Sequence, residues 1–384
     1  MNRMKQSSRW CVLFLSLSLT SEAAVGASAS QFGDRGVFDG VIPSASPRFT
    51  ANDDGAHLEG IPGLGQRRAW EQLEIPGATC GDGSPYSVFV SAGDPDKLVL
   101  SFMGGGACWD EATCYGPLRL TWLGGVSNPR DRMGGIYSAD RGKSAAADYT
   151  MVHFPYCTGD VHLGRHEAQY GGKKTFHVGA SNVEKALAQL IETHVVDPLR
   201  VSDLAVYGYS AGAIGALYHV DGINRLFPFT ARKTLLSDAP GLHFGPRFWK
   251  KFTPALRRDY AKAMKVIGYD LNPESGLMGD LVSKVCARFP DWQIGVLQGT
   301  HDIVMSAVFG DITPWEHARQ VFGPGGLWNA GRAEGDNCMV WIPTTPMHTF
   351  LVVDFSAEIE AEGASAWLFT RDRLSQRGDR SYRD

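Results

Sequence analysis

The stretch DLAVYGYSAGAIGAL at 203–217 constrains the fold more than any other part of the chain. An apolar run of strand length passes through Gly-Tyr-Ser-Ala-Gly into small and apolar residues that suit a helix. A strand that turns directly into a helix at a glycine-flanked serine is a nucleophile elbow, in which the tight bend exposes the hydroxyl above the sheet edge. The five-residue pattern alone is weak evidence, and a glycine-flanked helix cap is the alternative. The strand-turn-helix context favours Ser210 as a nucleophile.

Other segments repeat the same alternation of strand and helix. Strand-like runs occur at 97–103, 149–154, 203–208, 233–238, 292–299 and 338–343. A helix over 181–196 is predicted between two of them, behind a cap at Ser181 or Asn182. Its buried face would hold Val183, Leu187, Leu190, Ile191 and His194. The alternation predicts an α/β fold with a mostly parallel central sheet covered by helices on both faces.

The beginning of the chain is typical of an export signal. Three basic residues precede the short apolar run WCVLFLSLSL, and small residues follow it. We expect cleavage after Ala27 or Ala29, so that 1–29 form a signal peptide and the mature protein is secreted or periplasmic. The apolar run is too short to span a bilayer, and no later run is long enough, so no membrane association is expected.

The mature chain is predicted to be one catalytic domain over 30–384. Residues 30–54 are polar and are expected to form an irregular arm. Two segments, 108–148 and 243–290, interrupt the alternation and should form cap insertions near the site. The arginine-rich stretch 371–384 is expected to be a solvated end.

A serine nucleophile requires a base, an acid that orients the base, and donors for the oxyanion. In this kind of fold the chain order is Ser, then Asp or Glu, then His. His348 lies in a proline-braced loop just after the last strand-like run, where the fold delivers the imidazole. His219 falls in the elbow helix, and His317 looks like a helix-face residue. His348 is therefore the predicted base.

Three aspartates compete for the role of the acid. Asp302 follows the strand-like run 292–299 directly, at the end where parallel strands carry functional side chains. Asp238 and Asp311 are the alternatives, and any strand-end aspartate can be a simple turn former. Asp302 is preferred, and Asp238 is assigned to substrate binding.

Glycines at 104–106 end the first strand-like run. A glycine-rich turn lets backbone N–H groups approach a carbonyl oxygen without interfering side chains. The amide of Ala211, the residue after the nucleophile, is the expected second donor.

Several segments together carry a family resemblance. They are GGGACWDEATC, FPYCTGDVHLGRH, FHVGASNVEKAL, GYSAGAIGAL, SDAPGL, GTHDIVMS and MHTFL. In this order they resemble the pectin acetylesterase and Notum family of secreted carboxylesterases with an α/β-hydrolase-like fold, from about Lys97 to about Phe350. One departure is Ala107, which precedes Cys108 where the family often has an aromatic residue.

The resemblance implies roles for particular residues. The implied triad is Ser210, Asp302 and His348, and the implied oxyanion donors are Gly105, Gly106 and Ala211.

Six cysteines remain after removal of the signal peptide, and an even number in an exported chain indicates disulfides. Six cysteines allow 15 pairings. Cys108 and Cys114 lie close together and are expected to form a disulfide that stiffens the oxyanion loop. The resemblance also suggests Cys80 with Cys157, which leaves Cys286 with Cys338.

The first functional hypothesis is a secreted serine esterase that removes O-acetyl groups from a carbohydrate such as pectin. Trp109, Tyr115, Trp122 and Tyr156 could stack on sugar rings. Lysines and arginines in the cap segments argue against an apolar acyl channel and favour a short acyl group. The alternatives are a lipid or acyl-protein deacylase and, in another class, a non-catalytic binding protein on a hydrolase scaffold.

Other partners are not expected. Asp160, His162, His166 and His177 lie near one another in sequence, but their spacing matches no zinc signature, so neither a metal nor another cofactor is predicted. The formal net charge is -4 and nothing resembles a nucleic-acid footprint. We expect a monomer whose partner is its ester substrate.

Overall fold

A computed structural model describes residues 68–117, 119–126, 128–129, 134–332, 337–354, 358–378 and 380–384. The predicted signal peptide over 1–29 and arm over 30–54 lie outside these residues. The described residues all belong to one compact unit of the chain. None of their helices combines the length and the apolar character needed to cross a bilayer.

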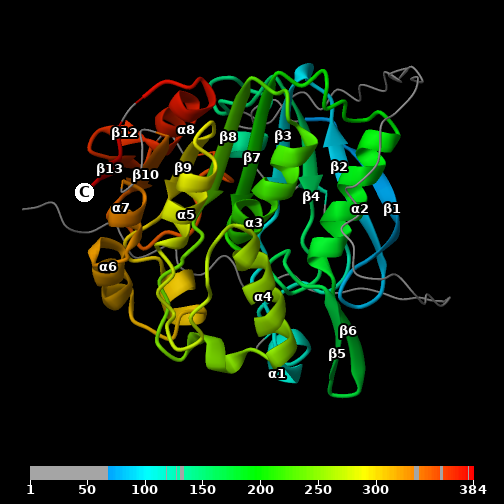
Figure 1. Cartoon of the computed structure of the whole chain (residues 1–384), viewed down its shortest axis with the longest axis vertical. Helices are drawn as coiled ribbons and strands as arrows, with labels where there is room; N and C mark the ends of the chain where they lie inside the picture. Colours follow the sequence, from blue (N-terminus) through cyan, green and yellow to red (C-terminus); the bar gives the residue numbers. More distant parts are fainter. Residues whose placement is uncertain are drawn as a thin grey trace, which may run out of the picture. The chain divides into compact units, whose positions relative to one another are not determined.

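A nine-stranded sheet forms the centre of this unit (Figure 1). In spatial order its strands are β1 (Glu71–Thr79), β2 (Pro85–Ser91), β4 (Tyr149–Phe154), β3 (Asp94–Phe102), β7 (Asp203–Tyr209), β8 (Arg232–Asp238), β9 (Gln293–Leu297), β10 (Cys338–Ile342) and β13 (Tyr382–Arg383). The pairs β1–β2 and β2–β4 are antiparallel, and all pairs from β4 to β13 are parallel. All six strand-like runs of the sequence belong to the sheet. The predicted α/β fold with a mostly parallel sheet is confirmed.

Helices and short elements fill the connections. The helices are α1 (Glu111–Cys114), α2 (Gly179–Glu192), α3 (Ala211–Leu226), α4 (Pro254–Val266), α5 (Leu281–Arg288), α6 (Pro314–Phe322), α7 (Leu327–Ala330) and α8 (Ala366–Leu374). Single helical turns are η2 (Gly135–Tyr137), η3 (Phe248–Lys251) and η4 (Val304–Val308). Two small hairpins complete the fold: β5 (His166–Tyr170) with β6 (Lys173–His177), and β11 (Glu360–Ala361) with β12 (Ala364–Ser365).

Alternate side chains of the strands enter two separate cores, as the period of two along a strand requires. Leu204 and Val206 of β7 pack into the core that α2, α3, α4 and α5 cover. Ala205 and Tyr207 of the same strand pack into the core that α8 and the segment around η2 cover. The parallel sheet is therefore buried on both faces, as such sheets are in α/β proteins.

The helix predicted over 181–196 is present, but its bounds differ. The helix α2 begins at Gly179, and the Asn182 side chain bonds to the backbone of Thr79 on β1 instead of capping the helix. Val183, Leu187 and Leu190 are buried as predicted. His194 lies beyond the helix with a φ of 58°, so it does not share the buried face.

The solvated end expected at 371–384 is confirmed only in part, because most of its described residues are exposed but several are fixed in the fold. Arg373 on α8 is buried, and its guanidinium donates to Gln293 at the start of β9. Tyr382 of β13 pairs with Trp341 of β10. The Asp384 carboxylate accepts from the backbone N–H of Thr344, in the loop that follows β10. The many basic residues made this segment look fully exposed. Long charged side chains can, however, pack their aliphatic part against the protein while the charged group forms hydrogen bonds.

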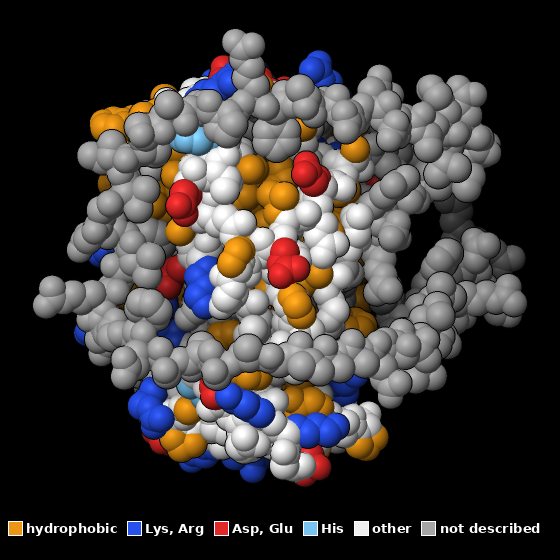
Figure 2. All heavy atoms as spheres, turned by 90° about the vertical axis from the view of Figure 1, so that its right-hand side faces the viewer, with side chains coloured by type: hydrophobic (Ala, Val, Ile, Leu, Met, Phe, Trp, Pro, Cys, Tyr) orange, Lys and Arg blue, Asp and Glu red, His pale blue; other side chains and the backbone are white. Residues whose placement is uncertain are grey.

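The strands β1 and β2, which the sequence patterns missed, form the opposite edge of the sheet. Exposed Glu71 and Glu74 on β1 place charge on this edge, which discourages pairing with another chain. Figure 2 looks onto this side of the molecule, where acidic side chains stand among hydrophobic and neutral ones. Lysine and arginine side chains gather at its lower end, where Figure 1 places the β5–β6 hairpin with its exposed Lys173 and Lys174.

Three disulfides join cysteines of the described residues: Cys80–Cys157, Cys108–Cys114 and Cys286–Cys338. These are the pairs expected above. The first joins the end of β1 to the end of β4, and the third joins α5 to β10. Three disulfides fit a protein of an oxidising, extracytoplasmic compartment.

Candidate active site

Ser210 occupies the turn between β7 and α3, with φ 55° and ψ -125°. This left-handed conformation is costly for a residue with a side chain and is often found at functional sites. A Cβ at Gly208 would lie 2.0 Å from the carbonyl oxygen of Gly212, and one at Gly212 would lie 2.1 Å from that of Phe102. Both glycines of the motif are therefore required sterically. The backbone N–H of Ser210 donates to the Asp238 carbonyl at 2.8 Å, which fixes the turn to β8.

His348 connects Ser210 to Asp302. Its Nε2 lies 2.8 Å from Ser210 Oγ, and its Nδ1 lies 2.8 Å from Asp302 Oδ2. Asp302 is fully buried, and its carboxylate also accepts from the Met305 N–H at 2.9 Å and the Gln298 side-chain amide at 3.0 Å. A hydroxyl, an imidazole and a fixed carboxylate in this sequence form the geometry of an activated nucleophile.

The three side chains meet because of the sheet topology. Ser210, Asp302 and His348 follow the carboxyl ends of β7, β9 and β10, which are parallel strands with β8 between the first two. Parallel strands present their carboxyl ends at one edge of the sheet, where α/β proteins bind ligands.

Asp238 ends β8 and bonds to the backbone that follows His348. It is fully buried, and its carboxylate accepts the backbone N–H groups of Phe350 at 3.0 Å and Leu351 at 2.8 Å. Burial raises the pKa of Asp238 to about 6. The carboxylate is enclosed beneath the loop that carries His348, which does not favour a substrate contact, and the role predicted for Asp238 stays a prediction.

The glycine segment lies directly against the serine. A Cβ at Gly104 would be 2.8 Å from Ser210 Cβ, and one at Gly105 would be 2.3 Å from the Tyr156 ring. Gly106, with a φ of 74°, lines the same pocket as Ser210 and Ala211. Ala211 begins α3, so its N–H has no partner within the helix. Backbone N–H groups can thus reach the serine from two sides.

Buried polar side chains hold the glycine segment from behind. The Tyr156 hydroxyl donates to the Gly106 carbonyl at 2.9 Å. His162 Nε2 donates to the Met103 carbonyl at 2.8 Å, and burial lowers the pKa of His162 to about 4, so it is neutral near pH 7. His219 Nε2 in turn donates to the His162 carbonyl at 2.9 Å. The glycine segment is therefore held by hydrogen bonds from within the protein.

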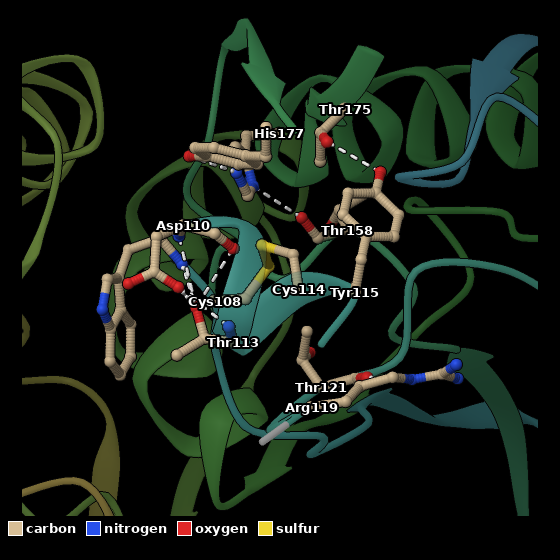
Figure 3. Close-up of a disulfide and its surroundings, with 12 residues drawn as sticks. Cys108, Asp110, Thr113, Cys114, Tyr115, Arg119, Thr121, Thr158, Thr175 and His177 are labelled. Atoms are coloured by element: carbon tan, nitrogen blue, oxygen red, sulfur yellow. Dashed lines mark hydrogen bonds between the residues drawn. A yellow bond between two sulfur atoms is a disulfide. The ribbon is translucent and has the colours of Figure 1, made fainter. Parts of the chain in front are cut away.

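The chain after the glycine segment is tied down by the Cys108–Cys114 disulfide (Figure 3). Asp110 accepts from the Thr113 N–H at 2.8 Å and caps α1. The Tyr115 hydroxyl is directed to Thr175 on β6, 2.7 Å away. Tyr115 therefore braces the β5–β6 hairpin.

Within the described residues, Cys108, Cys114 and His177 bring potential metal-ligating atoms together. Both sulfurs are engaged in the disulfide. His177 Nδ1 donates to the Thr158 carbonyl at 2.8 Å. His166 faces Asp259 at 2.6 Å, and Asp160 accepts from Thr158 at 2.6 Å. These side chains have partners in the fold, and we derive no metal chemistry from them.

An apolar pocket with a cavity volume of about 50 Å³ adjoins Ser210. Its lining consists of Gly106, Ala107, Val161, Leu163, Ser210, Ala211, Ile214, Phe244, Phe248, Trp249, Phe252, Tyr260, Met264, Met278, Met305 and Phe309. Seven of these residues come from segment 243–290. The segment 108–148 contributes none of them.

The cap segment 243–290 lines this apolar pocket despite its basic residues, and the cavity volume of about 50 Å³ leaves the expectation of a short acyl group standing as a prediction. Lys250 and Lys265 extend outward, with 58% and 67% of their side chains exposed. Phe248, Trp249 and Met264 from the same short elements turn inward and line the pocket. The amphipathic pattern of α4 was the available signal, since a helix can carry its charges on one face and its apolar residues on the other.

The aromatic residues proposed for substrate binding are not part of the lining of this pocket. Trp109, Tyr115 and Tyr156 do not line the pocket; Trp109 packs on the Phe252 ring at 5.1 Å between centroids. Trp122 is 45% exposed, and a Cβ placed on Gly105 would lie 3.0 Å from its ring. Trp122 is thus the accessible aromatic surface next to the glycine segment.

Comparisons with known proteins agree with the motifs. The sequence model of the pectinacetylesterase family matches residues 70–338, well over half of the chain. Pectin acetylesterase 11 of Arabidopsis thaliana is 27% identical over 248 residues, which cover 62% of this chain and 61% of that protein. The palmitoleoyl-protein carboxylesterase NOTUM of Schmidtea mediterranea is 29% identical over 153 residues, 38% of this chain and 28% of that protein. The chain spans about three-fifths or less of the length of these curated relatives.

A solved structure shares the fold. The Wnt deacylase Notum from Drosophila aligns with a TM-score of 0.56 and 17% sequence identity, over 82% of this chain and 98% of that chain. At this identity the likeness concerns the fold alone.

Proposed function

The chain belongs to the pectinacetylesterase family, a family of carboxylic ester hydrolases, and from this premise we propose that it is an exported serine carboxylesterase. One observation carries the proposal: His348 stands 2.8 Å from both Ser210 Oγ and Asp302 Oδ2 at the edge of the sheet. A binding protein on the same scaffold would not need this relay. The three disulfides support export, and the proposed location is secreted or periplasmic.

The mechanism follows from the geometry. His348 takes the proton of Ser210 Oγ as the oxygen attacks the ester carbonyl, and Asp302 holds the imidazole in the required tautomer. The amides of Gly105, Gly106 and Ala211 stabilise the oxyanion. His348 then gives its proton to the departing alcohol. Water, activated by the same imidazole, hydrolyses the acyl-enzyme and releases the acid.

The pocket beside Ser210 is assigned to the acyl group. Ala107 lines this pocket, and its small side chain leaves the space that an aromatic ring at this position would fill. A water occupies ~10–15 Å³ on the scale of this cavity, so about 50 Å³ holds about three to five groups of that size. With the carbonyl carbon at Ser210 added, this suits an acyl chain of about four to six carbons. We therefore propose an acyl group longer than acetyl.

A carbohydrate hydroxyl is proposed for the alcohol side. The exposed ring of Trp122 beside Gly105 supports this assignment, because an aromatic face can carry a sugar ring next to the reacting carbonyl. The name of the pectin acetylesterase relative points in the same direction. The apolar pocket also favours a second candidate, an acyl-protein deacylase, whose alcohol would be a protein hydroxyl.

Acyl length tests the proposal. We expect kcat/KM for p-nitrophenyl esters to peak at butanoate or hexanoate, with the Ser210→Ala variant as the inactive control. A peak of kcat/KM at acetate would contradict the longer acyl group and indicate an acetylesterase. A continuous rise of kcat/KM to palmitate would favour the acyl-protein deacylase. Comparing butanoylated pectin with a butanoylated serine peptide then separates the two alcohols.

A further inference from the structure

Gln298 lies directly against the carboxylate of Asp302, four residues further along the chain. It follows the end of β9 and is fully buried. Its backbone N–H donates to the Trp341 carbonyl at 3.1 Å, which continues the pairing of β9 with β10 by one more bond. The side chain therefore starts from a backbone position that the sheet fixes.

The side-chain amide of Gln298 has a partner at each end. Its nitrogen donates to Asp302 Oδ2 at 3.0 Å and to the Gly299 carbonyl at 3.2 Å. Its oxygen accepts from the Gly241 N–H at 2.9 Å. Exchange of the nitrogen and the oxygen would set an acceptor against two acceptors and a donor against the Gly241 N–H. The partners thus decide that the nitrogen faces the acid.

The anchor at Gly241 belongs to a packed part of the structure. A Cβ at Gly241, which has a φ of 76°, would lie 3.0 Å from the Met305 side chain and 3.0 Å from the Phe244 ring. Both of these side chains line the apolar pocket beside Ser210. Gln298 therefore connects the acid to the backbone at the beginning of the insertion that forms the pocket.

Asp302 Oδ2 accepts from two donors at once. His348 Nδ1 lies 2.8 Å away, and the Gln298 nitrogen lies 3.0 Å away, whereas Oδ1 accepts from the Met305 N–H at 2.9 Å. An aspartate carboxylate turns readily about its Cβ–Cγ bond, because that torsion has broad minima. A second donor on Oδ2, itself anchored at Gly241, opposes this rotation. It also helps to compensate a carboxylate charge that is withdrawn from water.

We infer that Gln298 is a positioning residue of the reaction, whose amide keeps Asp302 Oδ2 directed at His348 and so keeps the imidazole oriented toward Ser210. The inference rests on the proposed function, because it assumes that Ser210 attacks through His348. Gln298 does not line the pocket, so it acts through Asp302 and not on the acyl group. Its loss should therefore lower kcat more than it raises KM.

Gln298→Met tests the hydrogen bond, because methionine has a similar length and no amide. For p-nitrophenyl hexanoate, kcat should fall about ten- to a hundredfold, in the range of one hydrogen bond to a charged group. KM should stay nearly unchanged. Folding is followed by circular dichroism, as a check that the loss is not one of native protein.

Gln298→Glu separates positioning from packing. It keeps an oxygen for the Gly241 N–H and replaces the donor to Asp302 with a second carboxyl oxygen. Two carboxyl groups this close share one proton at low pH, and the protonated group can donate as the amide does. As the pH rises the pair loses that proton, and repulsion replaces the bond. The kcat of this variant, divided by that of the wild type at the same pH, should approach one near about pH 6 and fall toward the Gln298→Met value by about pH 9.

Gln293→Met is the matched control. Gln293 begins the same strand, at the end away from the site, and its side-chain oxygen accepts from Arg373 at 2.9 Å. The substitution removes a glutamine hydrogen bond of similar length from β9. It should lower Tm and leave kcat and its pH dependence unchanged.

The outcomes separate this inference from the proposed function. A wild-type kcat in Gln298→Met, or equal losses in Gln298→Met and Gln298→Glu at every pH, would overturn the inference and leave the esterase intact. If Gln298→Met fails to fold, Gln298→Glu decides alone, and a kcat ratio that does not change with pH contradicts the inference. Absence of turnover of every ester by the wild type would overturn both.

Discussion

Two walls surround Ser210, and they are built differently. The polar wall consists of Asp302, His348 and glycines 104–106, at the carboxyl ends of sheet strands. The apolar wall consists of inward-facing side chains from η3 and α4, within an insertion after β8, and of Ile214 on α3 beside them. Backbone hydrogen bonds and strand ends fix the first wall, whereas side-chain packing forms the second. We infer that residues at the strand ends carry out the reaction, whereas residues of the insertion largely determine which acyl group fits.

The largest effect should follow from breaking the polar wall at its centre. Ser210→Ala removes the nucleophile and should lower kcat for p-nitrophenyl hexanoate by at least 10³-fold, and on the order of 10⁶-fold if the serine protease precedent applies. Folding, followed by circular dichroism, should be preserved, and covalent labelling by a fluorophosphonate should be lost. Near-normal turnover by the variant would sink the triad assignment.

A second test of the polar wall compares two buried carboxylates, Asp302 and Asp238, which follow the neighbouring strands β9 and β8. Asp302→Asn should reduce kcat on the order of 10⁴-fold, because the amide no longer holds the imidazole tautomer. Asp238→Asn should lose only about ten- to a hundred-fold, because Asp238 acts through the backbone of Phe350 and Leu351. The measurement is kcat for both variants at saturating ester. If Asp238→Asn is the more damaging, the acid has been assigned to the wrong strand.

The apolar wall should change selectivity without changing the reaction. Ile214 lines the pocket one turn after Ser210, and Ile214→Phe fills space that the acyl chain would use. Loss of contact for about two methylenes, at about 0.8 kcal/mol each, predicts a fall in kcat/KM for hexanoate of roughly tenfold. Acetate hydrolysis should be nearly unchanged.

Leu199→Phe is the matched control, since Leu199 is 75% exposed and does not line the pocket. Its acyl-length profile should match the wild type. A uniform loss across all acyl lengths in Ile214→Phe would contradict the separation of the two walls.

The smallest effect concerns the supports behind the polar wall. Burial lowers the pKa of His162 to about 4 and of His219 to about 3, whereas an unfolded histidine titrates near 6.5. Below pH 6.5 the unfolded chain therefore binds protons that the folded protein does not, and stability falls by up to about 1.4 kcal/mol per pH unit for each histidine.

Asp238, with its pKa raised to about 6, opposes this trend between about pH 4 and 6, because there the folded protein holds a proton that the unfolded chain has released. The pKa of His153, His177 and His243 is also lowered by burial, and that of Asp160 is raised. The buried histidines outnumber the two carboxyls, so Tm should decline as the pH is lowered from 7 to 5. Thermal unfolding by circular dichroism across this range is the measurement, and a constant or rising Tm would contradict the prediction.

Sequence patterns located the polar wall well because each part is encoded within a few residues. Gly208 and Gly212 are needed for the elbow itself, so the motif and the geometry coincide. Asp302 and His348 follow strands whose apolar runs were visible, and chain order then limited the choices. The structure brings together the residues that the motifs proposed.

The sequence patterns did not reveal the apolar wall, because its apolar residues are scattered among basic residues along the chain. Phe248 and Met264 are separated by lysines and arginines, and only the helical arrangement of the segment sorts the two kinds of side chain. Tyr156 and Asp238 were predicted to bind substrate, and in the structure their polar atoms bond to backbone groups, since a polar residue beside a site can support the backbone as readily as it can face the substrate.

The pairing of β13 with β10 has a consequence for the timing of folding. Asp384 bonds to Thr344 in the loop that leads to His348, so residues near 384 help to hold a loop whose partners lie at 210 and 302. Such contacts join distant parts of the sequence and form late. During synthesis or export the elbow emerges long before this last strand, and the hydroxyl of Ser210 then has no base beside it. Docking of the chain near residue 384 adds to the hold on the loop that carries His348, so we expect activity to follow the formation of these distant contacts.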